Sequence, residues 1–382
     1  MKYLHYFRTE SAYNQARENN YVEPWVSYTE GKGLDYNKAG GGQSEVYSQI
    51  PFTIEALESG TISWNLEALT VEYSKNNGPW TTMDSETSIS VVQGDEVAFI
   101  GENNMYAYFN EDEEYVPLNI ISTARFNAKG NIMSLTEGDN FEQASSVDDY
   151  AFFMLFSDYY GGESAPIVSA EHLILPSTSL SISCYQAMFL GCEYLVYPPS
   201  TLPATELMAS CYISMFQDCT SLRTAPELPA TTLVDYCYNN MFSGCTSLTT
   251  APELPATTLA QYCCCRMFYG CTSLTTAPEL PATTLTKSCY DSMFRGCTSL
   301  EEAPVLPATT LVNQCYSNMF RSCSSLRQIK AMFTTTPGTG YTSGWVTDVS
   351  STGTFIKNSS AQWSVSGNNG IPSGWTVQTA SA

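Results

Sequence analysis

Cysteine and histidine are the side chains in this 382-residue chain best suited to act as nucleophiles, proton carriers or metal ligands. All 14 cysteines lie between Cys184 and Cys323, and the only histidines are His5 and His172. A thiol–imidazole nucleophile would have to join His172 to Cys184 or Cys192. Zinc held by cysteine alone would need paired Cys-x-x-Cys knuckles, and the chain has none. We therefore expect a non-enzymatic protein with no catalytic residue, no metal site and no cofactor.

The spacing of the cysteines bears on their oxidation state. Twelve form six pairs eight residues apart, and Cys264 and Cys265 are additional. Eight residues along a helix span about 12 Å, neighbouring helices pack about 8–10 Å apart, and a disulfide needs Cα atoms within about 7 Å. The sequence thus predicts reduced, buried thiols that behave as small hydrophobic groups. A secreted disulfide framework is the alternative.

Carboxylates supply two weaker possibilities. The acidic run Glu111–Glu114 offers oxygen ligands for Ca²⁺, but it lacks the alternating spacing of a calcium loop. A solvated loop is therefore the favoured interpretation. Glycoside hydrolysis would need two opposed carboxylates in a cleft, a pairing that this sequence does not establish.

The elements that position these residues form an internal repeat. Six Met-Phe pairs recur at a period of 27 once and then 26, beginning at Met188, Met215, Met241, Met267, Met293 and Met319. Repeats of this length indicate a solenoid whose units bury their apolar faces against their neighbours. In each unit we expect a strand such as Leu248–Leu254, then a helix after Pro255. Residues Leu259, Cys263, Met267 and Cys271, at four-residue spacing, would line one face of that helix.

The repeated line MF-x-G-C-T-S-L-x-x-A-P-x-L-P-A-T-T-L resembles the BspA-like leucine-rich repeats of Bacteroidales surface proteins and of their crAss-like or related phages. The resemblance is dense over residues 170–330, and the segment FTIEALESGTISW at Phe52–Trp64 resembles the same group. It implies a leucine-rich-repeat fold and a role in adhesion or host recognition, without naming a ligand.

The predicted fold class is multidomain α+β, in four parts. Residues 1–48, rich in tyrosine, would form a docking or oligomerisation element, with Tyr3, Tyr6, Trp25 and Tyr28 as its contact residues. Residues 49–136 contain six or seven short runs that indicate strands, one of them over residues 120–127, and an Asn76-Asn-Gly hairpin signal, typical of a β-sandwich. Residues 137–335 would form the leucine-rich-repeat-like α/β solenoid with its N-terminal cap, and residues 336–382 a C-terminal cap.

Within the predicted N-terminal cap, Phe152, Phe153, Leu155 and Phe156 are expected to cover the open end of the solenoid. On the C-terminal side, the recurring tryptophans favour capping over ligand binding.

The charge of the chain limits its partners. The formal net charge is −22, and residues 1–165 hold 26 acidic against 8 basic side chains. Nucleic acid is excluded because phosphate contacts need clustered Lys and Arg. Membrane insertion is excluded because no run of 18 apolar residues occurs. The first residues lack the apolar core of a signal peptide, which favours a particle assembled inside the cell.

Exposed positions that differ between repeats form the candidate ligand-binding surface. The predicted residues are Tyr236, Tyr262, Tyr269, Arg295, Arg321, Thr250, Thr276 and Glu302. Exposed tyrosine stacks on sugar rings and anchors interfaces, so a host-surface glycan or protein is the expected ligand.

Together these features predict a phage virion protein on the particle surface, such as a head or tail fibre or a decoration protein. Other virion proteins would bind its N-terminal segment, and a homotrimer is an assembly that fits a fibre. The alternatives are a bacterial cell-surface adhesin of the BspA-like family and an accessory module of a carbohydrate-active enzyme.

Overall fold

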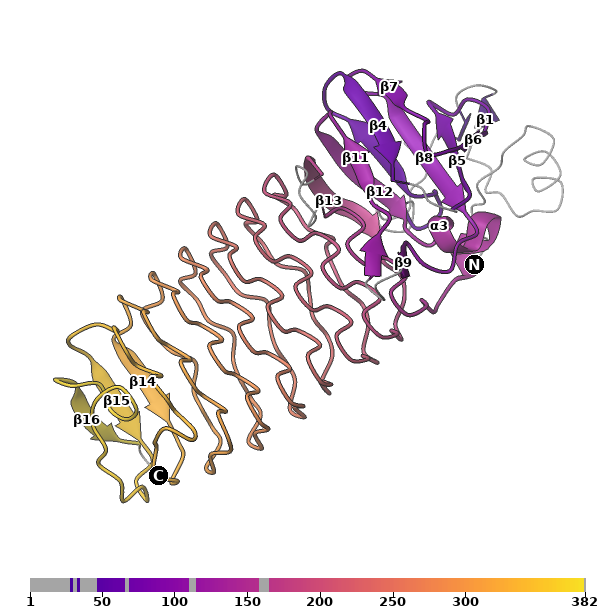
Figure 1. The fold of residues 1–382 in the computed structure, drawn as a ribbon. Helices are drawn as coiled ribbons and strands as arrows, with labels where there is room; N and C mark the ends of the chain where they lie inside the picture. The colour runs from indigo at the N-terminus through magenta and orange to yellow at the C-terminus, as the bar shows by residue number, and fades with distance from the viewer. Residues whose placement is uncertain are drawn as a thin grey trace.

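A computed structural model describes residues 28–29, 33–34, 47–65, 69–109, 115–157 and 165–380. A group of β-sheets lies at one end, successive circuits of the chain stack side by side behind it, and a small sheet closes the far end (Figure 1). Strand accounts for 23% of the structure and helix for 4%. The molecule is thus mostly β with several sheets, and not the α+β fold predicted.

Two sheets of the N-terminal half pack face to face, as in a β-sandwich. The larger has the order β13-β12-β3-β8-β5-β6 and the smaller β11-β4-β7. The bounds of the larger sheet are β13 (Ile167–Ile174), β12 (Phe126–Asn131), β3 (Thr53–Ala56), β8 (Glu96–Gly101), β5 (Val71–Lys75) and β6 (Thr81–Met83). Those of the smaller are β11 (Ile120–Ser122), β4 (Gly60–Trp64) and β7 (Ile89–Val91).

Shorter elements complete this half. They are the antiparallel pairs β1 (Tyr28–Thr29) with β2 (Gly33–Leu34) and β9 (Ala107–Phe109) with β10 (Tyr115–Pro117), the helix α3 (Ser134–Glu137) and the 3-10 helix η2 (Gly138–Gln143).

An aromatic cluster fills the space between the two sheets. Trp64 of β4 lies 6.4 Å from Phe52 and 5.3 Å from Phe99 of β8, measured between ring centroids. All three side chains are buried. The cluster belongs to both sheets, which is the packing expected of the predicted β-sandwich.

Two local predictions in this half had different outcomes. The Asn76-Asn-Gly hairpin is confirmed: Asn76 and Asn77 have φ of 53° and 57°, and β5 pairs antiparallel with β6. The single strand expected over residues 120–127 is wrong. It is divided into β11 and β12, which belong to different sheets, because the chain crosses between the sheets at residues 123–125.

The repeats form a stack of circuits that we call the coil stack (residues 175–327), each circuit being one coil of 26 or 27 residues. These residues contain neither helix nor strand, so the predicted strand-and-helix unit is wrong. Where Leu248–Leu254 was expected to form a strand, the structure has one isolated parallel bridge, between Thr250 and Thr276. Where a helix was expected, it has consecutive tight turns.

The consecutive turns define a turn segment in each coil. The six turn segments, in coils 1 to 6, are residues 181–192, 208–219, 234–245, 260–271, 286–297 and 312–323. In coil 4, the N–H groups of even-numbered residues from Tyr262 to Gly270 donate to carbonyls of coil 5. Those of odd-numbered residues from Cys265 to Cys271 donate three residues back within the coil. Successive N–H groups therefore bond alternately within and between coils.

Positive φ angles make an α-helix impossible in these segments. In coil 4, Tyr262, Arg266 and Gly270 have φ of 56°, 55° and 73°. A positive φ at the third position of a turn is the signature of a type II turn, and an α-helix requires φ near −60° throughout. The four-residue spacing that resembled a helical face is the period of these turns.

Parallel pairing joins the coil stack to both ends of the molecule. β13 pairs with β12 of the sandwich, and Ser169 of β13 bridges to Tyr197 of coil 1. At the far end, Glu302 bridges to Gln328 at the start of β14 (Gln328–Ala331). β14 is followed in one parallel sheet by β15 (Thr354–Lys357) and β16 (Thr376–Thr379) (Figure 1).

One hydrophobic core runs without interruption from the sandwich into the coil stack. Phe152 stacks on Tyr185 and Phe156 on Phe189, with ring centroids 5.7 and 5.0 Å apart. Phe152, Leu155 and Phe156 are buried as predicted, whereas Phe153 is only partly buried. Beyond β14, the buried indole Nε1 of Trp345 donates to the carbonyl of Gly370 at 2.9 Å.

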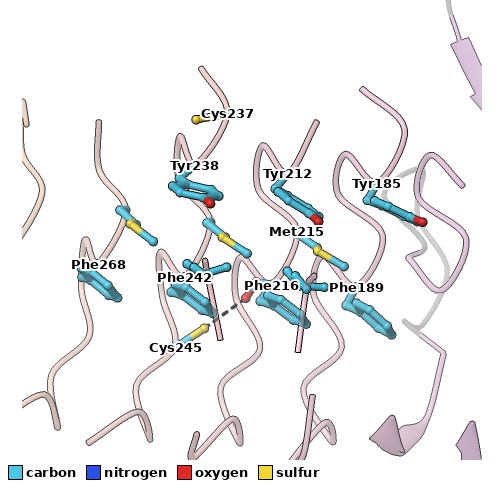
Figure 2. Close-up of a cluster of buried hydrophobic side chains, with 14 of the residues drawn as sticks. Tyr185, Phe189, Tyr212, Met215, Phe216, Cys237, Tyr238, Phe242, Cys245 and Phe268 are labelled. Atoms are coloured by element: carbon cyan, nitrogen blue, oxygen red, sulfur yellow. Dashed lines mark hydrogen bonds between the residues drawn. The ribbon is translucent and has the colours of Figure 1, made fainter. Parts of the chain in front are cut away.

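Equivalent side chains of successive coils stack in columns inside the coil stack (Figure 2). Phe216 and Phe242 lie 5.6 Å apart between centroids and are parallel within 2°. The thiols are buried as predicted. In one cysteine column each Sγ donates to a phenylalanine carbonyl of the preceding coil, as Cys245 does to Phe216 at 3.0 Å. The Phe216 carbonyl oxygen also accepts a hydrogen bond from the backbone N–H of Cys219. The Cys245 thiol therefore occupies the second lone pair of that oxygen.

We predict that Gly130→Ala destabilises the fold more than Gly94→Ala. Both glycines have positive φ, 84° and 87°, so each substitution carries backbone strain of about 1–2 kcal/mol. At Gly130, in β12, a Cβ would overlap the Pro51 carbonyl oxygen, whereas no atom lies within 4 Å at Gly94. This steric overlap should add about 1–3 kcal/mol to the destabilisation caused by Gly130→Ala. Urea unfolding of both variants measures the difference; equal losses would contradict the close approach at Gly130.

Thiol alkylation provides a second prediction. Burial raises the pKa of Cys211, Cys271 and Cys323 to about 12, so the reactive thiolate is scarce at pH 8. The folded protein should leave all 14 thiols unmodified by iodoacetamide, and denaturant should release all 14. A hydrogen bond with Cys264 lowers the pKa of Cys263, but Cys263 is fully buried. Rapid native alkylation at any site would contradict this packing.

Candidate recognition surface on the coil stack

The predicted tyrosines lie on the outer side of the turn segments. Tyr236 and Tyr269 are 39% and 37% exposed. Tyr262 stacks on Tyr236 with ring centroids 4.9 Å apart and planes 6° from parallel. The structure brings these two residues together because they occupy the same position in coils 3 and 4.

Cations cover two of these rings. Lys287 Nζ lies 5.4 Å from the Tyr262 ring centroid, and the Arg295 guanidinium carbon lies 5.4 Å from that of Tyr269. Both distances fall in the range of cation–π attraction. Arg321 follows Arg295 at the equivalent position of coil 6, and the Gly296 N–H donates to its carbonyl. We call Tyr236, Tyr262, Arg266, Tyr269, Lys287 and Arg295 the turn-face cluster.

Charge changes sign along the turn segments. Those of coils 1 to 3 carry two Asp and no Lys or Arg, a net charge of −2. Those of coils 4 to 6 carry four Lys or Arg and one Asp, a net charge of +3. Among the described residues, no ion pair within 4.0 Å involves Arg266, Lys287 or Arg295. The positive charge is therefore concentrated on one part of a chain whose total charge is −22.

Asp291 is the acidic residue within this basic region. It is partly buried, and desolvation raises the pKa of its carboxyl group. A hydrogen bond of 2.8 Å from Ser292 Oγ and the positive charges of Arg266 and Arg295 lower the pKa in opposition, with the smaller effect.

The other predicted residues lie on a different segment of the coils. Thr250 and Thr276 bridge to each other, and Thr276 and Glu302 line a shallow depression of about 480 Å³. All three are exposed. No hydrogen bond, ion pair or ring contact in the described structure joins them to the predicted tyrosines or to Arg295 and Arg321. The predicted surface is thus two separate sets.

The structure adds Arg266 to the predicted residues. Arg266 is exposed between Tyr262 and Tyr269 of the same turn segment. Sequence reasoning missed it because, on a helix, residue 266 would lie beside the buried positions 263 and 267. The turn period of four supplies the missing signal, since positions 262, 266 and 270 share positive φ.

Other chemistry is limited in the part of the chain that the structure describes. His172 stacks on Tyr47 with centroids 4.4 Å apart, and no contact joins it to a thiol. Searching these residues finds no group of three His, Cys, Asp or Glu side chains able to hold a metal, and no helix long and apolar enough to cross a bilayer. Glu111–Glu114, Tyr3, Tyr6 and Trp25 lie outside the described residues, as does the Tyr28 side chain.

Comparison of the chain with protein-family models, curated proteins and solved structures finds no match to any of them. The relation to BspA-like repeats therefore remains a resemblance carried by the repeated motif.

We predict that Asp291→Asn raises the urea midpoint at pH 7. Because the folded pKa of Asp291 is raised, the folded state binds its proton more tightly than the unfolded state. Stability from this group is present below the ordinary pKa of 3.8 and is lost as pH rises through the folded pKa. The gain over wild type should therefore vanish at low pH. Glu253→Gln, on an exposed side chain, is the control; a lower midpoint for Asp291→Asn at pH 7 would contradict the prediction.

Proposed function

We propose that this chain is a non-enzymatic adhesion protein that displays the outer side of its coil stack to a ligand on a cell surface. The observation that carries the proposal is the contrast between buried and exposed positions of equivalent coils. Phe216, Phe242 and Phe268 occupy one buried column without change, whereas the column through Tyr269 changes in every coil but one. It reads Gln217, Ser243, Tyr269, Arg295 and Arg321, of which Ser243 is buried, Tyr269 is exposed and the others are partly buried.

A frame of this kind supports recognition for a physical reason. Hydrogen bonds between coils fix the spacing of the columns, so exposed side chains are presented with little loss of backbone entropy on binding. Preorganised aromatic and arginine side chains dominate the binding energy of many interfaces. Outer positions of the turn segments that change from coil to coil while the phenylalanine column repeats fit this role.

We further propose that the protein belongs to a phage virion, as a fibre or decoration protein on the particle surface. Its N-terminal segment would attach it to other virion proteins, and a homotrimer fits such a fibre. The support is the resemblance of the repeats to those of Bacteroidales and their phages. A bacterial surface adhesin is the alternative with the same ligand-facing role.

An accessory module of a carbohydrate-active enzyme is a candidate from another class. The shallow depression lined by Glu301 and Glu302 is the feature that favours it, since carboxylates commonly bind sugar hydroxyls. Loss of glycan binding on changing Glu302 to Gln, with cell binding unchanged, would support this candidate.

Saturable binding of the labelled chain to intact Bacteroidales cells tests the adhesion proposal. We expect saturation, and reduced binding when Tyr236 and Tyr269 are both changed to Ala. The matched control changes Thr257 and Thr283 to Ala, two exposed positions of the coil stack that lie outside the turn segments and outside the depression. Failure of the folded wild-type chain to bind any cells would overturn adhesion.

Immunogold labelling with antibody to residues 170–330 separates the two locations. Label on purified phage particles is the expected result. Label on uninfected cells, with none on particles, would replace the virion proposal with the bacterial adhesin.

A further inference from the structure

We propose that the turn-face cluster binds an acidic polysaccharide, one whose sugar rings carry carboxylate or sulfate groups. This inference rests on the proposed adhesion function and names the ligand class of the same surface. Tyr236 and Tyr269 would stack on sugar rings, and Arg266, Lys287 and Arg295 would bind the acidic substituents.

Each of two tyrosines has one ring face in contact with a ring or cation of the next coil. We call the other face open, because among the described residues no ring or cation contacts it. Tyr262 stacks on one face of Tyr236, and Arg295 lies over one face of Tyr269. On the opposite side, the equivalent residues of the preceding coils are Ser210 and Ser243. A serine side chain is too small to cover a phenol ring, so both open faces point toward the N-terminal end of the coil stack.

Aromatic faces of this kind suit sugars. The apolar C–H face of a sugar ring packs on an aromatic ring, whose amphipathic edge stays in water. The two supporting contacts hold the rings before the ligand arrives, which lowers the entropic cost of binding. Tyr262 is already covered on both sides, by Tyr236 and Lys287, and serves as support for its neighbour.

The cations select for negative charge. Arg266 is exposed between the two tyrosine columns and has no ion pair within 4.0 Å among the described residues. A guanidinium binds carboxylate or sulfate through two parallel hydrogen bonds. Elsewhere the chain is strongly acidic, so an anionic ligand is repelled by most of the molecule and attracted to these coils.

An extended ligand fits better than a small one. The cluster spans coils 3 to 5 on an outer surface, and neighbouring coils are separated by the spacing of paired strands, about 4.8 Å. A polymer lying across the coils would contact Tyr236, Arg266 and Arg295 in turn. The acidic first half of a second copy is the competing occupant, and its binding would appear as self-association of the wild-type chain.

Calorimetry on the full chain tests the proposal with defined probes. Polygalacturonate and dextran sulfate supply the two acidic groups, and unmodified dextran is the neutral control. We expect binding to at least one acidic polymer, weakening as salt is raised, and none to dextran. Arg266→Gln should reduce affinity about tenfold.

Arg223→Gln is the matched control, because Arg223 is also an exposed arginine of the coil stack but lies outside the turn segments. It should leave affinity unchanged. Equal losses for Arg223→Gln and Arg266→Gln would show diffuse charge attraction and overturn the site. So would absence of binding to both acidic polymers, or wild-type self-association that Arg266→Gln abolishes.

Cell binding distinguishes failure of this inference from failure of the proposed function. If the chain binds cells but neither acidic polymer competes and Arg266→Gln has no effect, the ligand class is wrong and adhesion stands. If the folded chain binds the polymers but no cells, adhesion is wrong and the polysaccharide site stands.

Discussion

The alternation of backbone hydrogen bonds in the turn segments is the constraint on which the rest of the coil stack depends. Every second N–H reaches the next coil, as that of Phe268 reaches the carbonyl of Met293 at 2.9 Å. The remaining N–H groups close turns within their own coil. Because all these buried polar groups need partners, a coil is complete only when a neighbour lies on each side. Residues 150–156 supply the first neighbour by donating to carbonyls of coil 1, and residues 340–347 supply the last by accepting from N–H groups of coil 6.

This constraint also determines the core. Coils held at strand spacing place equivalent side chains directly against one another, so a buried residue must pack well on a copy of itself. Flat phenylalanine rings do so, with Phe242 and Phe268 5.7 Å apart and 4° from parallel. Cysteine combines small volume with a thiol donor for the phenylalanine carbonyl, as in Cys271 to Phe242 at 3.1 Å. Outside the core no such demand applies: the column through Tyr269 differs between coils, although exposed threonines such as Thr257 and Thr283 still repeat.

Sequence reasoning succeeded where local pattern and structure share one period. Short strand-forming runs between turn signals located most strands of the sandwich, and Asn76-Asn-Gly marked its hairpin. It failed in the repeats because buried residues at Cys263, Met267 and Cys271 fit both a helical face and turns of four residues. The positive φ of Tyr262 and Arg266 decides between a helix and consecutive turns. The sequence gives no sign of a positive φ at these positions, because neither residue is glycine. Because a helix was expected here, Arg266 was left out of the predicted surface. The tyrosines were included because of their chemical type alone.

Because the interfaces between coils are nearly identical, the coil stack can lengthen or shorten by one whole coil at a time. Phe216, Phe242, Phe268 and Phe294 meet their successors at centroid distances of 5.6, 5.7, 5.6 and 5.8 Å. Gain or loss of one 26-residue unit by recombination between repeats would therefore join surfaces that already match. Each such event between the sandwich and coil 3 would move the turn-face cluster by about 4.8 Å relative to the sandwich. Reach and ligand preference can thus be inherited separately, one through the number of coils and the other through what each coil exposes.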